Sequence, residues 1–162
     1  MTRKRNATPK PRAGRMTAQI LAERVVAGMM AKDAFSKWLG ITVVDVRPRR
    51  STVRATVRAE MVNGFGVAHG GIAYSIADSA LAFASNTHGK IAMAVENSIA
   101  YPAPVHIGDT LTAVAKLDSE SNRLAHYRVT VRNQKDDIVA PFRGMVYKTS
   151  NDHQLNTTGN NA

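Results

Sequence analysis

The sequence of 162 residues contains no cysteine and no long apolar run, and each absence narrows what the chain can be. Without cysteine there is no disulfide scaffold, no cysteine nucleophile and no thiolate metal site. Without a run of about 18 apolar residues we expect no membrane-spanning helix. The basic N-terminus lacks the apolar segment of a secretory signal. We therefore expect a cytoplasmic protein with one domain, whose core is supplied by the 44% of residues that are hydrophobic.

Positive charge is concentrated at the N-terminus. The formal net charge is +10, and six of the cations precede the first acidic residue, Glu23. They are Arg3, Lys4, Arg5, Lys10, Arg12 and Arg15. Removing these six charges leaves +4 for the rest of the chain. We predict that residues 1–16 form a disordered basic arm, for which a solubilising role and contact with nucleic acid or another anionic surface both stay open.

The remainder reads as one domain over residues 17–150, followed by a polar tail over 151–162 that we expect to be frayed. Apolar spacing predicts a helical region with a break at Gly28 and a second short helix capped by Asp33. Further along, the pattern predicts strands over 41–47 and 51–59, a helix over 70–86, and strands over 91–101, 110–117, 123–132 and 138–148. Short turns between strands favour an antiparallel sheet, and one long helix covers one of its faces. The prediction is an α+β fold.

The predicted central helix is unusually poor in polar side chains. Small residues dominate it, and Asp78 is its only charged residue. A helix of this kind is buried on most sides. A buried carboxylate must be paired, protonated or used in chemistry, so a structural Asp and a catalytic Asp both stay open.

The start of this helix offers a second candidate group. The sequence His69-Gly70-Gly71 places glycines where the first backbone amides of the helix lack partners, and such an end can stabilise an oxyanion. A plain glycine turn is the alternative. Seven residues separate Gly71 from Asp78, which is about 10 Å along a helix axis. Two groups acting on one carbonyl lie closer than this. A two-fold dimer with antiparallel central helices would bring Gly71 of one subunit to Asp78 of the other.

Several motifs together resemble one known family. They are Met61-Val62-Asn63-Gly64, His69-Gly70-Gly71, Ser75-Ile76-Ala77-Asp78, Ile107-Gly108-Asp109-Thr110-Leu111 and Phe142-Arg143-Gly144. Their combination is similar to the phenylacetic-acid-degradation group of hotdog-fold acyl-CoA thioesterases, over roughly residues 32–148. The resemblance implies an antiparallel sheet wrapped around one long helix. It also implies dimers and usually tetramers that hydrolyse acyl- or aryl-acyl-CoA without a metal or a separate cofactor.

The resemblance also implies roles for individual residues. Asp78 matches the nucleophile or general base, and Gly71 matches the oxyanion amide. Asn63 would lie near the reacting carbonyl or position a water. His69 would order the loop before the helix, and Gly70 would let the substrate approach the backbone.

Contacts with the substrate are harder to assign. Arg123 and Arg143 could meet the phosphates of CoA, or could be solvated surface residues. Phe65 and Tyr74 could line an acyl pocket, or could pack in the core.

One position departs from the family pattern. Where some relatives carry a hydroxyl residue facing the acid, this chain has Ala94, and Asn97 or Ser98 are the candidate substitutes.

Two other functions stay open. A non-catalytic acyl-CoA-binding regulator could use the basic arm on DNA, which is the only route to nucleic acid that we expect. A hotdog enoyl-CoA hydratase or dehydratase would pair His69 with Asp78, which are about 13 Å apart along one helix. The acyl group itself is not determined by the sequence.

Overall fold

The structure is a computed structural model that describes residues 16–155. Nearly all of the predicted basic arm, and residues 156–162 of the predicted tail, lie outside the described residues. Two helices come first, α1 (Ala18–Lys32) and α2 (Ala34–Leu39). The other elements, in chain order, are β1 (Thr42–Arg47), β2 (Arg50–Thr56), a short 3-10 turn at Ala59–Met61, α3 (Gly70–Asn86), β3 (Lys90–Ile99), β4 (Thr110–Glu120), β5 (Leu124–Arg132) and β6 (Ile138–Asp152).

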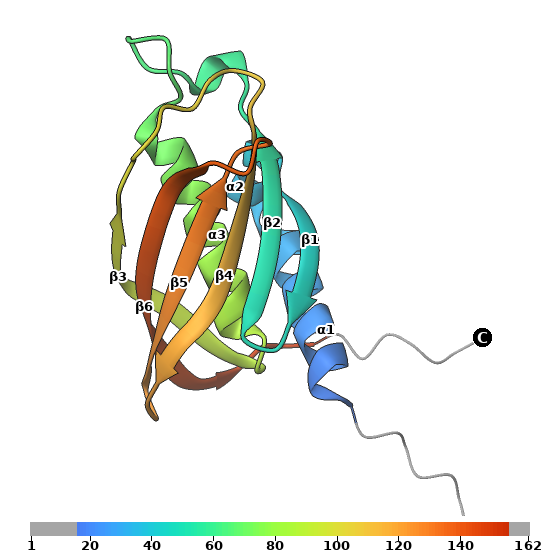
Figure 1. Cartoon of the computed structure of the whole chain (residues 1–162). Coiled ribbons are helices and arrows are strands. Elements are labelled where there is room, and N and C mark those ends of the chain that lie inside the picture. Colours follow the sequence, from blue (N-terminus) through green and yellow to red (C-terminus); the bar gives the residue numbers. More distant parts are fainter. Residues whose placement is uncertain (1–15, 156–162) are drawn as a thin grey trace, which may run out of the picture.

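The six strands form one antiparallel sheet in the order β1-β2-β4-β5-β6-β3. The sheet curves around α3 (Figure 1), α1 packs against β1 and α3, and α2 packs against α3. The predicted α+β fold, with an antiparallel sheet around one long helix, is confirmed. No helix in residues 16–155 is both long enough and apolar enough to cross a membrane.

Capping residues set the ends of the first two helices. The carboxylate of Asp33 accepts a hydrogen bond from the backbone N–H of Ser36 at 2.9 Å, which starts α2. Gly40 ends α2 in the left-handed conformation, with φ of 76°. The predicted break at Gly28 is wrong, because α1 continues through it to Lys32. A glycine inside a helix costs only about 1 kcal/mol relative to alanine, which the rest of α1 tolerates.

Small side chains let the sheet approach α3 closely. Ala77, Ala80 and Ala84 of the helix are fully buried. Ser51 of β2 donates a hydrogen bond from its hydroxyl to the carbonyl of Ala80 at 2.7 Å. Such a bond between a strand side chain and the helix backbone needs a short separation, which larger residues on this face would prevent.

The last strand is longer than predicted. β6 runs to Asp152, and the Lys90 ammonium pairs with the Asp152 carboxylate at 2.8 Å. The backbone N–H of His153 then bonds the carbonyl of Gly89 at 2.8 Å. Residues 151–153 are therefore held against the start of β3, although they were expected to belong to the frayed tail.

Gly144 of β6 should be intolerant of any side chain. A Cβ at this position would collide with Leu81 of α3 and lie 2.7 Å from Oδ1 of Asn97. We expect Gly144→Ala to lower the free energy of unfolding by about 1–3 kcal/mol, as overpacking does. Urea unfolding at one fixed protein concentration measures the change. Gly28→Ala is the matched control, because a Cβ there meets nothing within 4 Å. It should raise stability by up to about 1 kcal/mol, and equal effects of the two variants would contradict the packing argument.

Candidate active site

Asp78 lies midway along α3 with its side chain directed at β3. Its Oδ1 accepts a hydrogen bond from Nδ2 of Asn97 at 2.9 Å. Burial raises the pKa of the Asp78 carboxyl above its usual value, while the Asn97 hydrogen bond opposes that rise. The result is a half-buried carboxylate that has one fixed donor and is more basic than an ordinary surface Asp.

Asn97 is held between the helix and the neighbouring strand. Its Nδ2 also donates to the phenolic oxygen of Tyr74 at 3.0 Å, one turn before Asp78 on α3. Its Oδ1 is buried and has no hydrogen-bond partner within residues 16–155. Asn97 is opposite Gly144 in the β3–β6 ladder, where only a glycine leaves room for that oxygen. The side-chain amide of Asn97 is therefore positioned by α3 on one side and by β6 on the other.

This chain has Ala94 where some relatives carry a hydroxyl residue that faces the acid, so another side chain has to contact Asp78. Of the two candidate substitutes, Asn97 makes the hydrogen bond to Asp78, whereas Ser98 lines a cavity that also contains Arg143. The β3–β6 pairing shifts register between Ala94 and Glu96. A bulge of this kind breaks the alternation of side chains, so counting along the strand could not show which residue faces the acid.

The imidazole of His69 caps the start of α3. Its Nδ1 accepts a hydrogen bond from the N–H of Gly71 at 2.9 Å. An accepting Nδ1 carries no proton, so the proton of the neutral ring is on Nε2. The Gly71 amide is thus occupied by its own chain in this structure. His69 orders the start of the helix, and it is well separated along α3 from Asp78.

The ring of Tyr101 covers Gly70. Its hydroxyl donates to the carbonyl of Gly70 at 3.1 Å, and a Cβ on Gly70 would lie 3.1 Å from the Tyr101 ring carbon Cζ. A side chain at position 70 would therefore crowd the Tyr101 ring, which would have to shift to make room. From the sequence we expected Gly70 to let a substrate approach the backbone, and the contact between Gly70 and Tyr101 was not predicted.

The loop before α3 is a tight turn at one end of the molecule (Figure 1). The side-chain oxygen of Asn63 accepts the N–H of Phe65 at 2.9 Å, and its backbone oxygen accepts the N–H of Gly66 at 3.0 Å. Phe65 is 92% exposed, which rules out core packing within one chain. Tyr74 is partly buried, with its ring edge-on to Phe142 at 5.5 Å between centroids.

A single chain therefore holds the candidate residues in two groups. Asn63, His69 and Gly71 lie at the N-terminal end of α3. Asp78 lies two turns further along the unbroken helix, about 10 Å away along its axis. The pairing of His69 with Asp78 that a hydratase would need is not present within the chain.

The two candidate arginines lie in different places. Arg143 follows buried Phe142 and precedes buried Gly144 on β6, so its side chain is on the face of the sheet away from α3. Arg123 lies in the β4–β5 turn, where it lines a separate cavity. Within residues 16–155 no group of three or more His, Asp or Glu side chains is placed to hold a metal ion.

Comparisons with known proteins agree with this architecture. Residues 65–140 match the model of the family described as the thioesterase superfamily. The acyl-coenzyme A thioesterase PaaI of Escherichia coli is 37% identical over 120 residues, which cover 74% of this chain and 86% of that protein. The solved structure of E. coli PaaI, a protein of the phenylacetic acid degradation operon, superposes with a TM-score of 0.82 at 33% identity, covering 84% of this chain and 99% of that one.

A Streptococcus mutans protein solved with bound acetyl-CoA is 25% identical, with a TM-score of 0.67 and coverage of 70% of this chain and 91% of that one. The helix enclosed by the antiparallel sheet is shared with these relatives. The chain therefore belongs to the thioesterase superfamily, as a thioester hydrolase with the hotdog fold.

Proposed function

We propose that this enzyme hydrolyses acyl- or aryl-acyl-CoA thioesters to the free acid and CoA, with Asp78 as its reactive carboxylate. The observation that carries the proposal is the Asp78 side chain. It is the only charge in α3, it is half-buried, and a single amide donor fixes it. An acyl-CoA thioesterase at 37% identity and a relative with bound acetyl-CoA support the substrate class.

Two routes fit a carboxylate of this kind. In the first, Asp78 accepts a proton from water, whose oxygen attacks the thioester carbonyl. In the second, a carboxylate oxygen attacks directly, giving a mixed anhydride that water then cleaves. In both, the carbon–sulfur bond breaks and the CoA thiolate leaves and takes up a proton. Neither route requires a metal or a separate cofactor, so we propose that the enzyme is metal-independent.

The N-terminal end of α3 supplies the complementary group. The Gly71 N–H would bind the oxyanion that forms on the carbonyl, after exchanging its bond to His69. His69 would return to cap the helix when the product leaves. Asn63 has a side-chain N–H₂ with no partner within residues 16–155, and it would bind the carbonyl or the attacking water.

A second copy of the chain would complete the site. Among the strands of residues 16–155, β3 has a neighbour on one side only, and its Met93 and Val95 are 57% and 55% exposed. An unpaired strand with exposed apolar residues is a ready surface for another copy. Two copies related by a two-fold axis would place their α3 helices antiparallel, and would bring Gly71 of one chain to Asp78 of the other. We propose a homodimer, or a homotetramer built from two such dimers, in the cytoplasm.

The acyl group would lie against Tyr74 and Phe65. Tyr74 is adjacent to Asp78 through Asn97. Phe65 leaves most of its ring in water within one chain, so burial by a substrate or a second subunit would be favourable. Two aromatic rings in contact with the acyl group would suit an apolar or aromatic one.

Asp78→Asn should lose activity against acyl-CoA by about a hundredfold or more, roughly 2.7 kcal/mol of barrier. An amide can neither attack the carbonyl nor accept the proton from water. The measurement is thiol release from a panel of acyl- and aryl-acyl-CoA esters. Asp118→Asn, which removes an exposed carboxylate paired with Arg128 on β4 and β5, is the control and should keep wild-type rates. Equal turnover by Asp78→Asn and wild type would remove Asp78 from the mechanism.

Asn97→Leu should move the acidic limb of the pH profile of kcat/KM to higher pH. Asp78 must be ionised to act, so activity falls as the pH drops through its pKa. Burial raises that pKa and the Asn97 hydrogen bond lowers it, so removing the bond leaves burial unopposed. Ser98→Ala, the next residue on the same strand, is the matched control. An unchanged acidic limb in Asn97→Leu would show that Asn97 has only a packing role.

Mixing two inactive variants should restore activity if the site is shared. Gly71→Pro removes the N–H at a position in the first helical turn, where proline is tolerated. After Gly71→Pro and Asp78→Asn subunits are unfolded and refolded together, each mixed dimer has one intact site. Random mixing should then give about a quarter of wild-type activity. Sites formed within one chain would give no recovery above the two separate variants.

A further inference from the structure

Six cations of β2, β4, β5 and β6 lie on the face of the sheet that is turned away from α3, the helix that the sheet encloses in Figure 1. Side chains alternate along a strand, so the neighbours of a residue that packs toward the helix point outward. Val53 of β2, Ala115 of β4 and Val129 of β5 are fully buried, and each has a cation next to it in the strand. The six outward cations are Arg50, Arg54, Lys116, Arg128, Arg132 and Arg143.

Four of these cations form one row across the sheet. Arg50 of β2 is opposite Lys116 of β4, which is opposite Arg128 of β5. Arg128 is in turn opposite Arg143 of β6. Neighbouring strands lie about 4.8 Å apart, so the row spans about 14 Å. Like charges that are directly opposite one another destabilise a sheet. The needs of folding therefore do not explain this row.

A second, shorter row runs beside the first. Arg54 of β2 and Arg132 of β5 lie on either side of Thr112, and Nε of Arg54 donates to the Thr112 hydroxyl at 3.3 Å. Four residues separate Thr112 from Lys116 along β4, so the two rows are about 13 Å apart. The residues between them are Thr52, Val114 and Thr130. The cations that line a cavity of about 400 Å³ on this face are Arg50, Lys116, Arg128 and Arg132.

Few acidic side chains neutralise this face. Asp118 pairs with Arg128 at 2.8 Å, and the carboxylate of Asp136 lies 3.6 Å from Arg132. Both carboxylates are exposed, so solvent screens these pairs. Glu96 lines a cavity that also contains one of the six cations, but does not pair with it. The four cations without an ion pair within residues 16–155 are Arg50, Arg54, Lys116 and Arg143.

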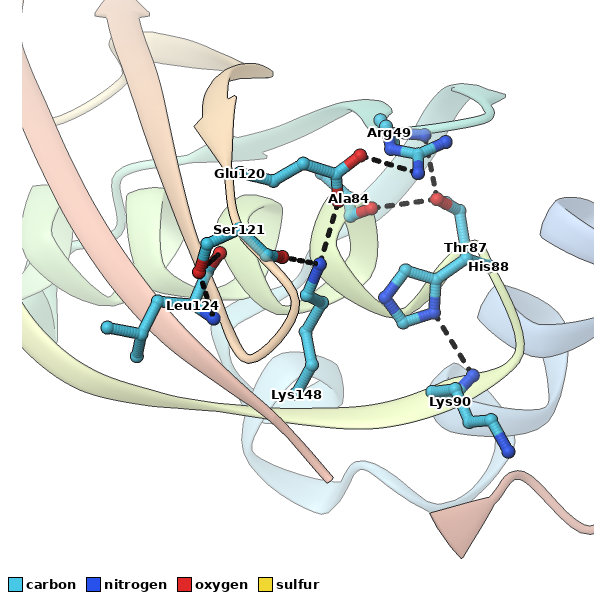
Figure 2. Close-up of polar contacts among 9 residues, drawn as sticks. All are labelled: Arg49, Ala84, Thr87, His88, Lys90, Glu120, Ser121, Leu124 and Lys148. Atoms are coloured by element: carbon cyan, nitrogen blue, oxygen red, sulfur yellow. Dashed lines mark hydrogen bonds and ion pairs between the residues drawn. The ribbon is translucent and has the colours of Figure 1, made fainter. Parts of the chain in front are cut away.

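The cations at the C-terminal end of α3 are arranged differently. There Arg49 and Lys148 share the carboxylate of Glu120, at 2.6 Å and 2.9 Å (Figure 2). Arg123 and His88 line the same cavity. A carboxylate between two cations offsets their repulsion. The row of four cations on the outward face has only Asp118 in this role, so most of its repulsion is not offset.

Arg50 adds a buried donor to the outward cavity. Its Nε is buried and has no hydrogen-bond partner within residues 16–155. A buried N–H without a partner costs about 1–3 kcal/mol, and an acceptor that enters the cavity would remove this penalty. Because the surrounding side chains are cationic, the acceptor that fits best is an anion that can make charge-assisted hydrogen bonds.

We propose that this outward face binds the sugar–phosphate backbone of a duplex nucleic acid, a function that does not depend on the thioesterase proposal. Arginine, lysine and threonine are typical phosphate contacts, and apart from Val114 they fill both rows and the space between them. No aromatic side chain lines the cavity between the rows, so the face has no platform for unpaired bases. Binding through the backbone alone does not depend on sequence. The folded face is thus a route to nucleic acid separate from the N-terminal arm.

Two other occupants fit this face less well. A second copy of the chain, docked through the same face about a two-fold axis, would bring cations against cations. A partner protein is usually held by apolar or aromatic anchors, and Val114 is the only apolar residue between the two rows. The spacing and chemistry of the rows therefore favour a regular polyanion.

Fluorescence anisotropy with labelled duplexes of about 20 base pairs, one of DNA and one of RNA, tests the proposal with the full-length protein. Binding of either duplex supports it. Replacing two unpaired cations together, Arg54→Gln with Lys116→Gln, should weaken binding at least about tenfold at about 50 mM salt. The slope of log K against log salt should fall by about 1.8, because each phosphate contact contributes about 0.9. Lys116→Gln alone should lower the slope by about 0.9 without loss of stability, since it relieves repulsion from Arg50 and Arg128.

The matched control removes the same charge from the other side of the sheet. Lys32 of α1 and Lys37 of α2 are exposed, and both helices pack against α3. Lys32→Gln with Lys37→Gln should keep wild-type affinity and salt slope, because the N-terminal cations are present in every variant. Absence of duplex binding by wild type, equal losses in the two double variants, or tighter binding to polyglutamate or anionic lipid vesicles would overturn the proposal. Displacement of the duplex by free CoA would assign the face to the thioester substrate and overturn it as well.

Discussion

The close enclosure of α3 by the sheet is the constraint on which the rest of the structure depends. A helix surrounded on most sides must present small side chains, and Ala77, Ala80 and Ala84 are fully buried. The same closeness lets Ser51 reach the helix backbone and leaves no room for a Cβ at Gly144. It also excludes part of the water from the middle of the helix, where Asp78, the one charged residue of α3, is half-buried. The close packing of the sheet around α3 therefore determines both the choice of small residues in the helix and the environment of Asp78.

Two opposing effects set the state of Asp78. Desolvation favours the neutral acid and raises its pKa, whereas the Asn97 amide favours the ionised form. Because desolvation is the larger effect, the carboxylate is a stronger base than it would be in water, while the hydrogen bond keeps it oriented. The cost of this arrangement is borne by Oδ1 of Asn97, which is buried and has no hydrogen-bond partner within residues 16–155, because the amide turns its donor toward both Asp78 and Tyr74. An unsatisfied buried oxygen costs about 1–3 kcal/mol, and such costs are typical of functional sites.

Most helices and strands could be predicted from the local sequence pattern, whereas the residues that contact the candidate site residues could not. The limits of α3 follow from its small residues and flanking glycines, and Asp78 stands out as its single charge. The helical break at Gly28 was wrong because surrounding helix formers outweigh one glycine. Asn97 stayed only a candidate, since a register shift in β3 decides which side chains face the helix. The cavity around His88 is lined by residues from four regions, and only the tertiary structure brings Arg123 and Arg49 to the same cavity.

The bond between Gly71 and His69 bears on how the proposed reaction would be accelerated. In the free chain the Gly71 N–H is bound to a neutral imidazole nitrogen. A ground-state thioester carbonyl is also neutral and gains little by displacing it. An oxyanion forms a charge-assisted hydrogen bond about twice as strong as a neutral one, so exchange becomes favourable only as negative charge develops. An amide released in this way stabilises the transition state more than the bound substrate, and such a difference raises kcat rather than merely lowering KM.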